Sequence, residues 1–137
     1  IAEKGPFHAV IGFSQGAALV TVLLSLQQKA NSTPLPVVAC VCGVRPDHRN
    51  EAPELNELIA SQTPLKCANV QLLGKTDPLR PKGLELKEVF DSTNQHLLEH
   101  SKGHQFPPWQ EKDSNTAFAA AMQALLDASP PDALFKP

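Results

Sequence analysis

The chain has 137 residues, of which 12 are Lys or Arg and 14 are Asp or Glu, so its formal net charge is 12 − 14 = −2. This length fits one domain with a sizeable core. The near-neutral balance gives no electrostatic reason to expect nucleic acid as a partner. The longest apolar run, Ala17 to Leu26, falls short of the roughly 20 residues that a membrane-spanning helix needs, so we expect no membrane span.

Short apolar runs of strand type alternate along the chain with longer helical patterns. The expected elements, in chain order, are a strand over 8–13, a helix over 15–29, a strand over 36–42, a helix over 53–60, a strand over 69–74, a helix over 83–91, a weaker strand over 95–100 and a helix over 113–128. Residues 15–29 are apolar almost all round, which predicts a largely buried helix.

The run over 36–42 is apolar on both faces, as a parallel sheet covered by helices requires. The order β-α-β-α-β-α-β-α therefore predicts an α/β fold with a doubly wound parallel sheet. We expect one domain over 1–137, in which 44–64 is a cap or an irregular loop and 129–137 a loose tail. The odd cysteine count, three, favours reduced thiols, and we expect a cytoplasmic protein.

The motif with the sharpest chemical meaning is Gly12-Phe13-Ser14-Gln15-Gly16. It lies between an expected strand and an expected helix, which is where a nucleophile elbow occurs. The turn strains the Ser14 backbone, so the residues two before and two after it are expected to be small to let strand and helix approach. The helix N-terminus then faces the reacting carbonyl, and the Gln15 N–H is a candidate oxyanion-hole donor.

A serine hydroxyl needs a base to take its proton. The loop after the third strand contains Asp77, and the loop after the fourth contains His104. The order Ser14, Asp77, His104 is that of the α/β-hydrolases, with His104 as general base and then acid and Asp77 orienting the imidazole. His100 is the rival histidine, favoured less because it ends a strand, and Asp47 is the second-choice acid.

Cofactor and metal sites find little support. The segment Gly74-Lys75-Thr76 resembles the end of a phosphate-binding loop, but Asn69 stands where that loop needs its first glycine. No glycine-rich dinucleotide fingerprint follows any strand. Cys40 and Cys42 are two apart with no matching ligand pair, which does not suit zinc. We therefore expect neither cofactor nor metal.

Three stretches of the sequence, together with the residues that precede the first stretch, resemble one family. They are Gly5-Pro6-Phe7 leading into Gly12-Phe13-Ser14-Gln15-Gly16-Ala17-Ala18, then Gly74-Lys75-Thr76-Asp77, then Glu99-His100-Ser101-Lys102-Gly103-His104 with Pro107. The chain resembles the serine hydrolase family of the α/β-hydrolase superfamily typified by the fungal FSH proteins and the ovarian-tumour-suppressor-candidate hydrolase. The resemblance implies hydrolysis of a carboxylic ester or thioester, with Ser14, Asp77 and His104 as triad.

One departure from the family matters. The family's domain begins with further strands and helices, including a His-Gly loop that supplies a second oxyanion N–H, and nothing here corresponds to them. The chain opens at Ile1, without Met. We therefore expect the C-terminal part of such a domain, with about four parallel strands and flanking helices. Loss of one oxyanion donor costs about 2.7–4 kcal/mol of transition-state stabilisation, so low activity is expected of this piece alone.

Three functions follow as hypotheses. The first is a serine carboxylesterase or thioesterase that acts on a small acyl ester or thioester through an acyl-enzyme on Ser14. The second is a non-catalytic interaction module or an inactive fragment, and the third is a peptidase on the same fold. Phe13, Phe106 and Trp109 are candidates for lining an acyl pocket, although aromatic residues beside an elbow are more often core.

Overall fold

The computed structural model describes residues 7–32, 35–46 and 52–129. Four strands, β1 (Ala9–Phe13), β2 (Val37–Val41), β3 (Ala68–Gly74) and β4 (Gln95–His100), form one parallel sheet in the order β1-β2-β3-β4. Each begins and ends within one residue of the expected strand. β1 and β2 are rich in apolar and β-branched residues and β3 is mainly apolar, the composition that fits a pleated, packed surface, whereas β4 holds only two apolar residues, Leu97 and Leu98.

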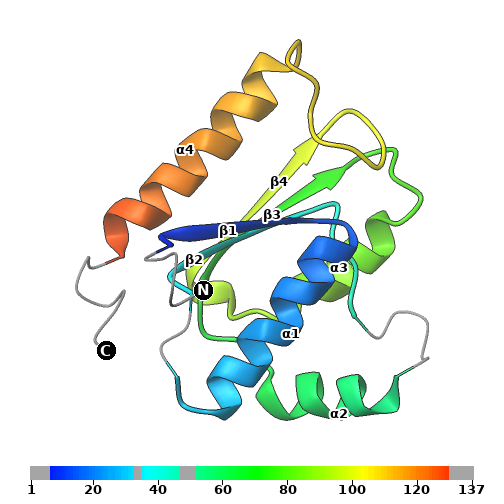
Figure 1. The fold of residues 1–137 in the computed structure, drawn as a ribbon. Helices are drawn as coiled ribbons and strands as arrows, with labels where there is room; N and C mark the ends of the chain where they lie inside the picture. The colour runs from blue at the N-terminus through cyan, green and yellow to red at the C-terminus, as the bar shows by residue number, and fades with distance from the viewer. Residues whose placement is uncertain (1–6, 33–34, 47–51, 130–137) are drawn as a thin grey trace.

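The helices lie on both faces of this sheet. They are α1 (Gln15–Lys29), α2 (Pro53–Gln62), α3 (Arg80–Lys87) and α4 (Lys112–Ala128), with a short 3-10 turn, η1 (Ser92–Asn94), before β4. Figure 1 shows α1, α2 and α3 on one side of the sheet and α4 on the other. The α/β class with helices flanking parallel strands, predicted from the apolar run of β2, is confirmed, since every residue of β2 is buried.

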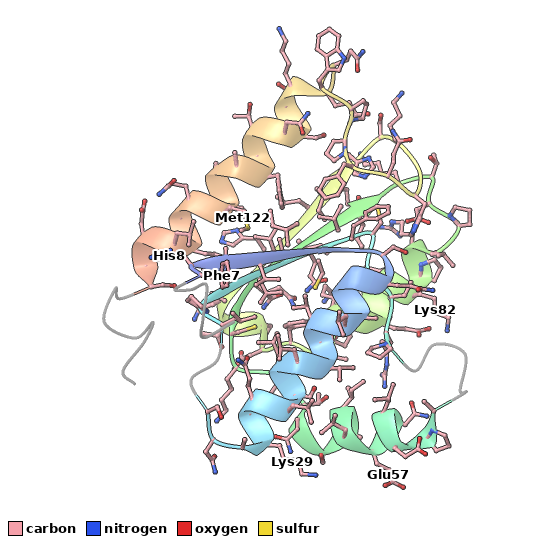
Figure 2. The ribbon with its side chains drawn as sticks, viewed as in Figure 1. Phe7, His8, Lys29, Glu57, Lys82 and Met122 are labelled. Atoms are coloured by element: carbon pink, nitrogen blue, oxygen red, sulfur yellow. The ribbon has the colours of Figure 1, made fainter. Side chains whose placement is uncertain are left out.

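Alternate residues of each strand feed the two cores, as the two-residue period of a strand requires. On one face, Val38 and Cys40 of β2 pack with Val20 and Leu24 of α1 and with Leu86 of α3. On the other face, Val37, Ala39 and Val70 pack against Ala121 and Leu125 of α4. Charged residues of the helices point outward, as Lys29 and Glu57 do in Figure 2.

Two expectations about the helices were wrong. The third helix was expected over 83–91, but α3 begins at Arg80, because Pro81 in its first turn suits a helix start, and it ends at Lys87. α1, which was expected to be largely buried, is buried on one face only. Leu19 is 71% exposed and Leu26 50% exposed, because the described residues cover α1 on one side only.

Within the described ranges the sheet has two edge strands, since β1 pairs with β2 alone and β4 with β3 alone. Ile11 of β1 is 51% exposed. Within the expected irregular segment 44–64, α2 packs against α1, and Gln28 Nε2 of α1 donates to the Gln62 carbonyl oxygen at 2.6 Å. Among the described residues, none of the helices combines the length and the apolar character that crossing a bilayer requires.

Candidate active site at the carboxyl edge of the sheet

Ser14 occupies the single residue between the end of β1 and the start of α1. Its backbone has φ 51° and ψ −115°, a conformation that residues other than glycine rarely adopt. The Ser14 N–H donates to the Val41 carbonyl oxygen at 2.9 Å, so the β1–β2 ladder continues up to the turn. The structure therefore has the strained strand-to-helix elbow that the motif predicted, with Ser14 at its tip.

The two glycines of the motif differ in their surroundings. A Cβ at Gly12 would lie 2.6 Å from the Ala17 nitrogen and 2.7 Å from its Cα, so only glycine lets β1 and α1 approach this closely. Gly16 was expected to be small for the same reason. That expectation is wrong, because no described atom other than those of its chain neighbours and its own helix backbone lies within 4 Å of a Cβ built at Gly16.

Asp77 lies in the turn that follows β3, as predicted. Its side chain is 2% exposed, and its Oδ1 accepts the Leu79 N–H at 2.7 Å. The Asp77 N–H donates to the Gly74 carbonyl oxygen at 3.1 Å, which closes the turn. These two bonds hold the carboxylate in one orientation and leave its second oxygen, Oδ2, for another donor.

His104 lies in the loop between β4 and α4 and makes a hydrogen bond with each ring nitrogen. Nδ1 lies 2.8 Å from Asp77 Oδ2, and Nε2 lies 2.8 Å from Ser14 Oγ. Because a carboxylate oxygen only accepts, the neutral ring carries its proton on Nδ1, and Nε2 is free to accept the Ser14 hydroxyl proton. The three side chains predicted to act together therefore meet, although 90 residues separate Ser14 from His104.

The turn that carries Asp77 and the loop that carries His104 pack directly against each other. The Thr76 N–H donates to the Lys102 carbonyl oxygen at 3.2 Å. A Cβ at Gly74 would lie 2.2 Å from the Gly103 oxygen and 2.5 Å from the Lys102 oxygen. Gly74 is thus the point where backbone touches backbone, and this contact sets the separation of the Asp77 carboxylate from the His104 ring.

The rival histidine lies elsewhere. His100 ends β4, is 1% exposed and makes its hydrogen bonds to Lys102 and Cys42. None of the hydrogen bonds of this buried ring, within the described ranges, reaches Ser14. Asp47, the second-choice acid, lies outside the described residues.

The N-terminus of α1 lies beside Ser14. The first backbone bonds of this helix run from the N–H groups of Ala17 and Ala18 to the Ser14 carbonyl oxygen, at 3.1 and 3.4 Å. The N–H of Gln15 precedes both, in the first turn, where helix N–H groups lack intrahelical acceptors. Its role as an oxyanion donor stays a prediction.

A stacked pair of aromatic rings lies beside His104. Phe13 and Phe106 stack with ring centroids 5.4 Å apart, and the Phe13 ring lies 5.2 Å from the His104 ring. Phe13 is 37% exposed, Phe106 46% and Trp109 78%. These three residues are therefore not core, the commoner alternative for aromatic residues beside an elbow.

The composition of the site was incompletely predicted, because Cys42 also belongs to it. Its Sγ, a carboxylate oxygen of Asp77 and a ring nitrogen of His104 lie within 4.8 Å of one another, the only such group of three possible metal ligands in the described part of the chain. Cys42 follows β2 and was interpreted only as a buried strand thiol. No sequence spacing links it to Asp77 or His104, so only the tertiary structure brings it here.

Comparisons with known proteins agree with this geometry. Residues 1–116 match the model of the serine hydrolase (FSH1) family. The chain is 30% identical over 112 residues to the esterase FPY3 of Fusarium mangiferae, covering 78% of this chain and 51% of that protein. It is 36% identical over 109 residues to the esterase OVCA2 of Bos taurus, covering 77% and 45%.

The fold has a solved relative as well. The crystal structure of the Paleococcus ferrophilus monoacylglycerol lipase matches with a TM-score of 0.59 at 12% identity, over 88% of this chain and 68% of that one. This likeness shows the α/β-hydrolase fold alone. The chain spans about half the length of the esterases named above. The family model matches most of the chain, and the chain has the elbow serine and the sheet of an α/β-hydrolase. The chain therefore belongs to the FSH1 serine hydrolase family.

Proposed function

We propose that this chain carries the catalytic triad of a serine esterase or thioesterase, with Ser14 as nucleophile, His104 as general base and acid, and Asp77 as the residue that orients His104. The observation that carries the proposal is the unbroken chain of two 2.8 Å contacts from Ser14 Oγ through the His104 ring to Asp77 Oδ2. The esterase names of the relatives support the same chemistry.

In the first half-reaction, Ser14 Oγ attacks the carbonyl carbon of the ester while its proton passes to His104 Nε2. The carbonyl electron pair moves to oxygen, and the negative charge faces the N-terminus of α1, where the Gln15 N–H is the proposed donor. The oxyanion then collapses. The bond to the leaving alcohol or thiol breaks, and the leaving group takes the proton from His104.

In the second half-reaction, water attacks the acyl group on Ser14. His104 Nε2 takes a proton from the water as it attacks, and returns it to Ser14 Oγ when the acid leaves. Asp77 keeps its negative charge throughout and stabilises the imidazolium that forms twice in the cycle. Both half-reactions use the same two hydrogen bonds, so one geometry serves acylation and deacylation.

The substrate is proposed to be a small-molecule carboxylic ester or thioester. The stacked, partly exposed pair of Phe13 and Phe106 lies beside the His104 ring, and an apolar acyl or alcohol group would bury its surface against these rings. A cytoplasmic location is part of the proposal, since the three cysteines are free thiols. Fractionation of cells that express the protein with a fluorescent tag tests the location.

The test of the chemistry is labelling with a fluorophosphonate, which reacts with activated serines. We expect Ser14→Ala to abolish labelling and to lower kcat by about 10⁶-fold, as loss of a triad nucleophile does. Ser61→Ala, in the exposed C-terminal turn of α2, is the matched control and should label like the unsubstituted chain. Undiminished labelling of the Ser14→Ala variant would sink the assignment.

A further inference from the structure

Two buried polar side chains behind His104 have no part in the proposed chemistry. Cys42 and His100 are each 1% exposed. Cys42 directly follows β2, and His100 is the last residue of β4, so both lie at the same edge of the sheet as the triad. Cys42 contacts the turn that carries Asp77, and both residues also make hydrogen bonds to the loop that carries His104.

The sulfur of Cys42 lies beneath the backbone on both sides of His104. Its Sγ is 3.4 Å from the Gln105 carbonyl oxygen and 3.8 Å from the Gly103 carbonyl oxygen. A thiol has one proton to donate, so the shorter contact, to Gln105, is the principal hydrogen bond and the Gly103 oxygen is the second acceptor. The residue before His104 and the residue after it are thereby tied to a single buried atom.

The ring of His100 holds the start of the same loop. Its Nδ1 accepts the Lys102 N–H at 3.2 Å, and its Nε2 lies 3.9 Å from Cys42 Sγ. Because Nδ1 accepts, the neutral ring carries its proton on Nε2. That proton points to the sulfur. A continuous series of contacts therefore runs from Lys102 through His100 and Cys42 to Gln105.

Two further observations support a role for the sulfur. Cys42 has φ 46°, a left-handed conformation that glycine adopts without strain and other residues rarely adopt. A side chain kept at such a position has a use that offsets the strain. Burial, chiefly, raises the pKa of the Cys42 thiol from its ordinary value, with a contribution from the charge of Asp77. The sulfur thus keeps its proton at neutral pH and remains a donor.

We propose that Cys42 and His100 are positioning residues, which act through the loop backbone to place the His104 ring between Ser14 and Asp77. Neither touches the substrate in this scheme. The loop from 101 to 111 has no strand or helix of its own. Its other backbone contacts, at Thr76 and Glu111, hold residues 101 and 102, so the Cys42 series is the part that reaches the residues directly before and after His104. The proposal rests on the proposed function of the triad.

The kinetic test compares two buried cysteines of the same segment. Cys42→Ala removes the sulfur beneath the loop. Cys42→Gly also removes the sulfur and relieves the backbone strain, so it serves as the second variant if Cys42→Ala fails to fold. Cys40→Ala is the matched control. Cys40 is 0% exposed and packs in the opposite core with α1, away from the loop.

With a p-nitrophenyl ester of a short fatty acid, we expect both Cys42 variants to lower kcat about tenfold or more with KM within about twofold. Misplacement of a catalytic group by about 1 Å can cost about 100-fold. The Cys40→Ala variant should stay within about twofold of the unsubstituted chain in both constants. Equal kcat for the Cys42 and Cys40 variants, measured on folded protein, overturns the proposal.

A second measurement is independent of turnover. Long-range ¹H–¹⁵N spectra of the unsubstituted chain report which ring nitrogen of each histidine carries the proton. We expect His100 in the Nε2–H form, and Cys42→Ala should shift its Nε2 resonance while Cys40→Ala leaves it in place. A His100 ring protonated on Nδ1 contradicts the series of contacts. If the unsubstituted chain neither turns over the ester nor reacts with fluorophosphonate, the proposed function fails, while these spectra still decide whether the contacts exist.

Discussion

The nucleophile and the acid–base pair are held in different ways. Ser14 is placed by one local segment, because β1 ends and α1 begins on either side of it and Gly12 lets the two approach. Asp77 and His104 are placed by two connections that leave different strands and touch backbone to backbone at Gly74. A local elbow depends on its neighbours in sequence, whereas the acid–base pair depends on the packing of segments about 27 residues apart.

This difference indicates which part of the site tolerates substitution with the least change in geometry. The elbow lies between two regular elements with continuous backbone hydrogen bonds. The His104 loop is held by backbone contacts with the Asp77 turn and by side chains at its two ends. At the far end, Glu111 accepts the Ser101 N–H at 3.2 Å and the Ser114 hydroxyl at 3.1 Å. We expect substitutions at the contact between the two connections to lower both kcat and the free energy of unfolding, and substitutions at the elbow glycines to act mainly on the free energy of unfolding.

The largest expected effect in this comparison is at Asp77. Asp77→Asn removes the charge that stabilises the imidazolium and offers an amide in place of an acceptor, so kcat should fall by about 10⁴-fold, as in other triads. Asp127→Asn, at an exposed position near the end of α4, is the control and should leave kcat unchanged. A loss of less than tenfold in the Asp77→Asn variant would show that a different acid serves His104.

The next effect tests the contact between the two connections. Gly74→Ala forces a methyl group against the carbonyl oxygens of Gly103 and Lys102, 2.2 and 2.5 Å away. We expect a loss of about 3 kcal/mol in the free energy of unfolding from this overpacking, together with a lower kcat because the loop must move.

The control for this change lies on the other side of the same contact. At Gly103 the nearest atom to an added Cβ is the Thr76 oxygen at 3.6 Å, an ordinary contact, and no described glycine has a positive φ. Gly103→Ala should therefore change the free energy of unfolding by less than about 1 kcal/mol. Urea denaturation measures both variants, and equal losses would contradict the asymmetry.

The smallest effect separates the two glycines of the elbow. Gly12→Ala brings a methyl group to 2.6 Å from the Ala17 nitrogen, and we expect a loss of about 2 kcal/mol in the free energy of unfolding. Gly16→Ala meets no described atom and lies in the first turn of α1, so it should be neutral or stabilise by up to about 1 kcal/mol. A large loss at Gly16 would mean that another part of the protein packs there.

Local rules predicted much of this fold. β1, β2 and β3 were found within a residue because their apolar runs end at glycine or at a turn, and these features depend only on neighbours in sequence. The start of α3 was missed because the residues before Gly83 have no apolar periodicity, and Pro81 was not used as a sign of a helix start. The exposure of Leu19 was not predicted, because the apolar residues of a helix face do not indicate whether another element packs against that face.

For the site, the sequence by itself determined which residue types could do the chemistry and in what order they occur. The serine lies in a strand–turn–helix motif, and the acid and the histidine follow later strands. In a parallel α/β topology, these three positions lie at the same edge of the sheet. Only the tertiary structure decided that His104 rather than His100 reaches Ser14, that Gly74 sets the spacing of the two connections, and that Cys42 lies beneath the histidine loop. The physical reason is that hydrogen bonds need atoms within about 3 Å, and no spacing along the chain fixes a distance between loops that leave different strands.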